Sequence, residues 1–393
     1  MKIAVIGLGK AGLPIASVIV NRGFEVVGVA IDERKCEDIN GGKNPIPEEI
    51  GLDELIKMHG GKGLIATANY ENAKECEIFI IIVPLFTDEN NNPDYSIIES
   101  AFRNVGRILK KGDLVVLETS VPPGTTEERA RKWLEEESGL KLGEFYLAYS
   151  PERIMTGFSI SRLEKFPKVV GGVDKESGQK AFVTYQTFIP NLHLVSSARV
   201  AEFTKIAEGC YRDVNIGLAN ELFKIAGELD VNFYEARTYA NHEYCHIHLP
   251  STGVGGHCIP VYPWFLVNDM EKRDKFDYAK LLRTAREIND EMIEYWAEKI
   301  VLELECMKIN RPLNELKICV KGISFREGVK ELYHSRNLAL AKLLSEKGLN
   351  VYVYDELFSK EEVGEMGLKY LEPEDADLVF DSFRLTLEKY DNR

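Results

Sequence analysis

The sequence lacks long hydrophobic runs and an excess of basic residues. Its longest apolar runs, such as residues 78–83, are far shorter than the roughly 20 residues that cross a bilayer, so we expect no membrane segment. The apolar N-terminus leads into a glycine turn and does not read as a secretory signal. The net charge is −14, and because phosphate backbones bind cationic surfaces, we expect no nucleic-acid partner.

The sequence also lacks the cysteine spacing of a disulfide framework. Its seven cysteines are an odd number, and no C-x-x-C occurs. This usage is typical of a reducing compartment, so we expect a cytoplasmic protein. A single cysteine in an unusual context is then a candidate nucleophile.

Alternating apolar runs and amphipathic stretches predict an α/β fold. The first half carries strand-like runs at residues 2–6, 25–31, 77–83, 113–117, 146–148 and 168–171, which favours a parallel sheet. Residues 201–230 and 278–306 read as long helices around a loop at 241–263. A strand at 317–322, a helix at 335–347 and a strand at 350–354 follow. We therefore expect two Rossmann-like parallel-sheet domains, at 1–195 and 301–393, joined by a helical region at 196–300. The last domain looks trimmed after residue 354.

A glycine turn opens the first predicted helix. Gly7, Gly9 and Gly12 follow a strand in a G-x-G-x-x-G pattern, which suits the pyrophosphate of a dinucleotide at a helix N-terminus. The alternative is a tight turn that binds nothing. Asp32 lies 20 residues past Gly12, where an acid hydrogen-bonds the cofactor's ribose, although it could equally cap the next helix.

A second glycine-rich loop, at 253–260, contains a cysteine. Gly253, Gly255, Gly256 and His257 precede Cys258. A thiolate here could attack an aldehyde, lose hydride to form a thioester, and release an acid with water. The alternative is a buried structural cysteine in a tight turn.

This loop resembles the catalytic-cysteine motif of the nucleotide-sugar 6-dehydrogenases, the UDP-glucose/GDP-mannose dehydrogenase family. The UDP-N-acetylmannosamine branch is the most similar, because 263–266 follow the cysteine as they do there. Further matching blocks lie, in the same order, at 83–84, 91–94, 121–126, 150–154, 201–202, 205, 211–215 and 219–222.

The resemblance implies NAD-dependent oxidation of the C6 alcohol of a nucleotide sugar to a carboxylate, for polysaccharide biosynthesis. It implies a homodimer or larger homo-oligomer formed by the helical region, and it leaves NADP open as the cofactor. By position, Cys258 is the nucleophile, Lys205 stabilises the oxyanion, Glu152 assists water, and Ser120 replaces a threonine. The cofactor-binding candidates are Gly7, Gly9, Gly12, Asp32, Lys35, Val83 and Pro84. The substrate-binding candidates are Arg212, Asn215, Gly255, Gly256, His257 and Lys321. The block Tyr211-Arg212-Asp213 could instead form an interhelical ion pair at the dimer interface, and Lys321 could be plain surface charge.

Several positions depart from the family pattern, and they fall on its chemistry. The ribose acid aligns with Ala30, an asparagine four residues after the lysine with Gly209, and an aspartate four residues after the cysteine with Tyr262. Leu85 replaces a threonine, while Tyr244 and Tyr333 each replace an arginine. Three interpretations follow: a dehydrogenase with substitute groups, an enzyme with an altered substrate or fewer steps, or an impaired homologue that binds nucleotide.

A histidine and cysteine cluster offers a different class of function. His242, Cys245, His246, His248, His257 and Cys258 fall within 17 residues, and these are the usual zinc ligands. The spacing matches no standard finger, and the resembled family needs no metal. We therefore predict no metal, with a metal-binding protein on this scaffold as the lesser alternative.

Overall fold

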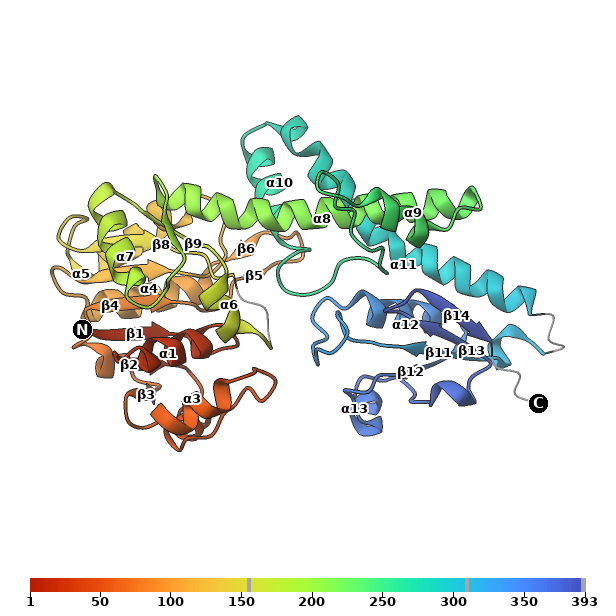
Figure 1. Ribbon diagram of the computed structural model, residues 1–393, viewed down its shortest axis with the longest axis horizontal. Coiled ribbons are helices and arrows are strands. Elements are labelled where there is room, and N and C mark those ends of the chain that lie inside the picture. Colours follow the sequence, from red (N-terminus) through yellow and green to blue (C-terminus); the bar gives the residue numbers. More distant parts are fainter. Residues whose placement is uncertain (154–156, 308–310, 390–393) are drawn as a thin grey trace. The chain divides into compact units, whose positions relative to one another are not determined.

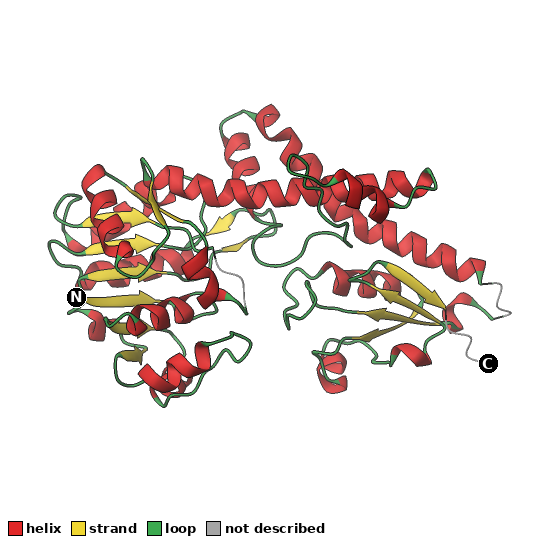
Figure 2. Cartoon of the chain, viewed as in Figure 1, coloured by secondary structure: helices red, strands yellow, loops and turns green. Residues whose placement is uncertain are grey.

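The computed structural model describes residues 1–153, 157–307 and 311–389 (Figures 1 and 2). Ile154 of the 150–154 block lies outside them. The chain divides into two compact units, residues 1–207 and 208–393. Each is described by itself. Over the described residues, no helix is long and apolar enough to cross a membrane.

The first unit is built on one eight-stranded sheet with the order β10-β9-β8-β7-β4-β1-β2-β3. Its strands are β1 (Lys2–Ile6), β2 (Glu25–Val29), β3 (Leu64–Thr67), β4 (Ile78–Ile81), β7 (Leu114–Leu117), β8 (Tyr146–Tyr149), β9 (Lys168–Gly172) and β10 (Leu192–Leu194). Neighbouring strands are parallel except at β8 and β9, which pair antiparallel through Ala148 and Gly172. A separate two-stranded ribbon joins β5 (Phe86–Thr87) to β6 (Pro93–Asp94).

Helices cover both faces of this sheet, as Figure 1 shows. They are α1 (Gly12–Asn21), α2 (Glu33–Asn40), α3 (Leu52–His59), α4 (Ser96–Ile108), α5 (Arg131–Ser138), α6 (Ser159–Lys165) and α7 (Lys175–Gln186). Alternate strand residues enter two separate cores: Ile3 and Val5 join one, and Ala4 and Ile6 join the other. Both faces are therefore buried, which explains why these strands read as continuous apolar runs.

The long helix α8 (Ala198–Glu228) begins in the first unit and continues in the second. The second unit adds α9 (Phe233–Ala240), α10 (Tyr262–Lys272), α11 (Lys280–Cys306), α12 (Arg336–Glu346) and α13 (Lys360–Glu365). Its sheet has the order β12-β11-β13-β14, with β11 (Lys317–Lys321), β12 (Asn350–Tyr354), β13 (Leu378–Asp381) and β14 (Thr386–Lys389). The first three strands are parallel and β14 closes an antiparallel hairpin. The α/β fold with two parallel-sheet regions and a long helix is confirmed.

Candidate active site

The glycine turn between β1 and α1 uses its three glycines in different ways. Gly7 has a φ of 101°, and a Cβ there would lie 2.5 Å from the carbonyl oxygen of Ile82. A Cβ on Gly12 would lie 1.8 Å from the carbonyl oxygen of Gly7. A Cβ on Gly9 would have nothing within 4 Å. The fold itself thus requires Gly7 and Gly12, whereas Gly9 keeps open a space that a side chain would fill.

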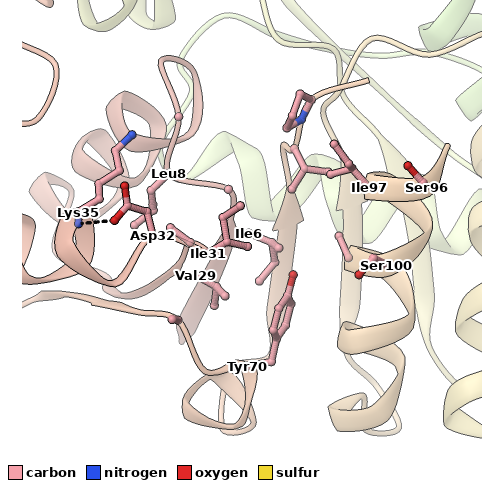
Figure 3. A pocket seen from close by; sticks show the side chains of 17 residues that line it. Ile6, Leu8, Val29, Ile31, Asp32, Lys35, Tyr70, Ser96, Ile97 and Ser100 are labelled. Carbon is pink, nitrogen blue, oxygen red and sulfur yellow. Dashed lines mark hydrogen bonds between the residues drawn. The ribbon is translucent and has the colours of Figure 1, made fainter. Parts of the chain in front are cut away.

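That open space belongs to a cavity of about 530 Å³ at the carboxyl ends of β1, β2 and β4 (Figure 3). The predicted cofactor residues Gly7, Gly9, Asp32, Lys35, Val83 and Pro84 all line it. Tyr70 and the start of α4, with Ser96, Ile97 and Ser100, complete the wall. Gly12 is not part of the lining and acts through the packing of the turn. A mostly apolar crevice beside a glycine turn and a helix N-terminus fits a dinucleotide, whose pyrophosphate needs close backbone approach.

The acid near this cavity is engaged in capping. Asp32 is the N-cap of α2, and its carboxylate accepts a hydrogen bond of 3.1 Å from the backbone N–H of Lys35 (Figure 3). The residue that directly follows β2 is Ala30, whose backbone N–H donates to the carbonyl oxygen of Thr67. Of the two roles that the sequence left open for Asp32, the structure contains the cap.

The candidate catalytic residues Ser120, Glu152 and Lys205 lie in the first unit, where a buried acid joins the segments of Ser120 and Lys205. Glu202 on α8 accepts hydrogen bonds from the backbone N–H groups of Gly124 (2.5 Å) and Thr126 (2.8 Å), and from the Thr126 hydroxyl (2.6 Å). It thereby fixes the loop after Ser120 to the helix that carries Lys205. Lys205 and Glu152 are both half-buried, and the N–H of Glu152 donates to the carbonyl oxygen of Glu118 at 3.4 Å.

Sequence reasoning placed Glu202 only in a block that matches the family pattern, and it missed the hydrogen bonds that join this side chain to the loop at 124–126. Its side chain is fully buried, and this burial raises the pKa of its carboxyl to about 7, although the three donors lower it. Sequence reasoning had one available signal: an acid opening a long helix, downstream of a proline-glycine turn rich in donors.

Cys258 lies in the second unit and is exposed. Its carbonyl oxygen accepts the N–H groups of Val261 (3.1 Å) and Tyr262 (3.0 Å), so the residue stands at the turn that starts α10. The loop glycines before it pack closely on protein. A Cβ on Gly255 would lie 2.7 Å from the carbonyl oxygen of His334, and one on Gly256 would lie 3.0 Å from the ring of Phe325. Their lack of a side chain is therefore explained by the fold, and their contact with substrate remains a prediction.

The histidine before the cysteine is held in place by two contacts. The ring of His257 stacks on that of Tyr333, with centroids 3.9 Å apart and planes 11° apart. Its Nε2 lies 3.5 Å from a carboxylate oxygen of Glu331. Tyr333, which replaces an arginine of the family pattern, thus supports the residue next to the nucleophile candidate.

Two other departures from the family pattern turn out to be neighbours. A Cβ on Gly209 of α8 would lie 2.3 Å from Cδ2 of the Tyr262 ring. Tyr262 is 5% exposed, so its ring fills the space that any side chain at position 209 would need. Gly209 and Tyr262 therefore form one steric pair, a relation that no pattern in the sequence indicates.

The predicted substrate residues on α8 have structural partners of their own. The Asn215 amide donates to the carbonyl oxygen of His246 at 2.7 Å and accepts the N–H of His248 at 2.8 Å, which ties the loop after α9 to α8. Asp213 makes a buried ion pair with Arg286 of α11 at 2.7 Å. This interhelical ion pair lies within the chain and involves Asp213, whereas the sequence had suggested a pair at a dimer interface, which the structure does not test. Arg212 is exposed.

A cavity of about 230 Å³ lies beside the cysteine loop in the second unit. Its lining includes Gly253 and Gly255 of the loop and two cationic side chains, Arg326 and Arg336. Lys321 lines a different, acidic pocket with Glu372, Glu374, Asp381 and Glu388, and its ammonium lies 3.2 Å from Asp381. The structure thus places two arginines, and not Lys321, beside the predicted substrate loop.

The remaining polar cluster forms a turn. The ring of His242 accepts the N–H of Tyr244 at 3.2 Å, and the backbones of His242 and Cys245 exchange two hydrogen bonds of 3.0 Å. Tyr244 itself is 86% exposed. Within residues 1–153, 157–307 and 311–389, no group of three His, Cys, Asp or Glu side chains is arranged to hold a metal ion.

The sequence and the structure both match known proteins. The model of the UDP-glucose/GDP-mannose dehydrogenase family, NAD binding domain, matches residues 1–189, and that of the family's central domain matches residues 199–291. A UDP-N-acetyl-D-mannosamine dehydrogenase of Methanococcus maripaludis is 36% identical over 362 residues, covering 90% of this chain and 79% of that protein. The structure of a UDP-D-ManNAc dehydrogenase from Pyrococcus horikoshii is similar with a TM-score of 0.87 and 33% identity, over 97% of this chain and 89% of that one. A UDP-N-acetyl-mannosamine dehydrogenase of Staphylococcus aureus gives 0.81 and 30%, over 96% and 87%.

Proposed function

The chain belongs to the UDP-glucose/GDP-mannose dehydrogenase family, and we propose that it oxidises the C6 alcohol of a UDP-N-acetylmannosamine-like nucleotide sugar to a uronic acid. The observation that carries this proposal is the exposed Cys258 on a glycine loop that lines a cavity with Arg326 and Arg336. Guanidinium groups bind phosphate through paired hydrogen bonds, so this cavity suits the diphosphate of a nucleotide.

The proposed steps assign a role to each candidate residue. Gly9 and the cavity around it hold the nicotinamide dinucleotide, which supplies the hydride acceptor when bound. The Cys258 thiolate attacks the aldehyde formed by the first oxidation, giving a thiohemiacetal whose hydride loss leaves a thioester. Water then releases the acid and restores the thiol. Lys205, carried over by position, stabilises the oxyanions, and Glu152 assists the water.

The decisive experiment measures reduction of NAD and NADP by absorbance against a panel of UDP- and GDP-sugars. We expect two cofactors reduced for each sugar oxidised. Cys258→Ala should abolish acid formation, whereas Cys306→Ala, at another exposed cysteine, should keep it. An unchanged steady rate of acid formation in Cys258→Ala would refute the cysteine mechanism.

The departures from the family pattern favour one alternative, a nucleotide-binding homologue with impaired catalysis. Gly209 offers no side-chain donor where the family pattern has an amide, and loss of one such donor costs about two to three decades in rate. Tight binding of UDP-sugars without turnover, in folded protein, would support this alternative.

The proposal includes a homodimer formed along α8. Exposed apolar side chains recur every seven residues on this helix at Tyr211, Leu218 and Ile225, and Leu229 lies in the turn directly after it. Such a stripe suits a second copy of the same helix. Leu218→Glu with Ile225→Glu should halve the mass measured by light scattering. A dimer that survives both substitutions would refute this interface.

The proposal also assigns the enzyme to the cytoplasm and to polysaccharide biosynthesis. All seven cysteines are free, which suits a reducing compartment. Uronic acids made on nucleotide carriers are building blocks for glycan polymerisation. Detection of the chain in a cytosolic fraction would test the location.

A further inference from the structure

The end of strand β2 determines how a Rossmann site tells NAD from NADP. An acid at this point accepts hydrogen bonds from the adenosine ribose of NAD and repels the 2′-phosphate of NADP. In this chain the residue that follows β2 is Ala30, and it lines the cavity. Its methyl group neither accepts a hydrogen bond from a ribose hydroxyl nor repels a phosphate.

The nearest acid, Asp32, caps a helix and does not replace the acid missing at the end of β2. One oxygen of the Asp32 carboxylate accepts the N–H of Lys35 at the start of α2, and the residue is exposed. Water screens an exposed charge, so its repulsion of a phosphate is weak. The helix cap thus engages one oxygen of an exposed carboxylate that lies two residues past the position where an acid selects NAD.

A cation and an apolar surface complete this end of the cavity. Lys35 lines it from the first turn of α2, as Figure 3 shows. Ile31 also lines it and is 98% exposed, which leaves a bare apolar side chain where an adenine ring would stack. Ala30, Ile31 and Lys35 therefore accept an adenosine with or without a 2′-phosphate.

We propose that Ala30 and Lys35 make this dinucleotide site bind NADP about as well as NAD. The proposal rests on the proposed function in that the cavity is taken to hold the dinucleotide. Its test is a binding measurement, which needs no sugar and no turnover.

Isothermal titration of the full chain with NAD and with NADP should give dissociation constants within about tenfold of each other. Ala30→Asp should shift their ratio toward NAD by about tenfold to hundredfold, the range of one hydrogen bond to a charged group. Lys35→Met should weaken NADP about tenfold more than it weakens NAD, since the 2′-phosphate adds the charge that this cation would pair with. Lys57→Met is the matched control, because this α3 lysine pairs with Asp53 outside the cavity and should change neither constant.

Two results would overturn the inference. One is a preference for NAD over NADP of about a hundredfold in the unaltered chain, and the other is an Ala30→Asp variant with both constants unchanged. Folded protein that binds neither dinucleotide would refute the proposed function as well. The two failures are therefore distinguishable.

Discussion

The contact between Gly209 and Tyr262 predicts that the effect of Gly209→Ala on stability changes sign when the Tyr262 ring is removed. In the native chain, Gly209→Ala would place a Cβ 2.3 Å from the buried Tyr262 ring. Overpacking of this kind costs about 1–3 kcal/mol. Replacing glycine by alanine inside a helix stabilises the helix by about 1 kcal/mol. The substitution should therefore destabilise the second unit by up to about 2 kcal/mol.

In a Tyr262→Ala background the clash is gone and only the helix gain remains. Gly209→Ala should then stabilise by about 1 kcal/mol, although Tyr262→Ala alone costs about 3–5 kcal/mol for its buried ring. Gly227→Ala is the matched control, since a Cβ at this α8 position meets nothing within 4 Å. It should stabilise both backgrounds equally.

Denaturant unfolding followed by tryptophan fluorescence would measure these changes in the free energy of unfolding. A Trp133→Phe background leaves Trp264 and Trp296, which both report on the second unit. An effect of Gly209→Ala that is the same with and without the Tyr262 ring would refute the steric reasoning.

Two further predictions concern the first unit. Gly9→Ala should keep the native stability but weaken dinucleotide binding by at least about tenfold, whereas Gly12→Ala should unfold the turn, because only the second Cβ meets backbone at 1.8 Å. Thermal unfolding with titration checks this, and full binding by Gly9→Ala would contradict it. Burial raises the pKa of Glu202 to about 7, so between about pH 4.5 and 7 the folded state holds a proton there that the unfolded state has lost. The free energy of unfolding should therefore fall by up to about 3 kcal/mol as the pH rises from about 4.5 to 7, and then level off. Denaturation at pH 5, 6 and 8 should show this slope in the native chain, and a Glu202→Gln variant with the same slope would disprove it.

The apolar runs predicted most of the parallel strands to within two residues at either end. The run at 350–354 matches β12 (Asn350–Tyr354), and the run at 2–6 matches β1 (Lys2–Ile6). Buried parallel strands have no solvent face to interrupt their hydrophobicity, so such runs stand out. Strands β3, β10, β13 and β14 were missed, because none is longer than four residues and Thr386–Lys389 lies at a polar edge.

The sequence predicts candidate residues from local spacing, but it does not predict partners that are distant along the chain. The spacing of glycines along the sequence predicts both the turn at 7–12 and the loop at Cys258. In contrast, the buried ammonium of Lys168 lies 2.8 Å from the carboxylate of Glu118, which also accepts the Tyr185 hydroxyl at 2.6 Å. Nothing local to these three residues indicates that they meet, since Glu118 follows β7, Lys168 begins β9 and Tyr185 lies on α7.

The departures from the family pattern can be weighed by how they fit their surroundings. A site that drifts without selection collects substitutions one at a time, and each leaves a cavity or a clash for its neighbours. Here Tyr262 fills the space left by Gly209, and Tyr333 stacks on His257 beside the nucleophile candidate. Asp32 caps α2 while Ala30 occupies the end of β2. Substitutions that fit each other in this way favour a rebuilt site over a decaying one, and hence a dehydrogenase with changed preferences over an impaired homologue.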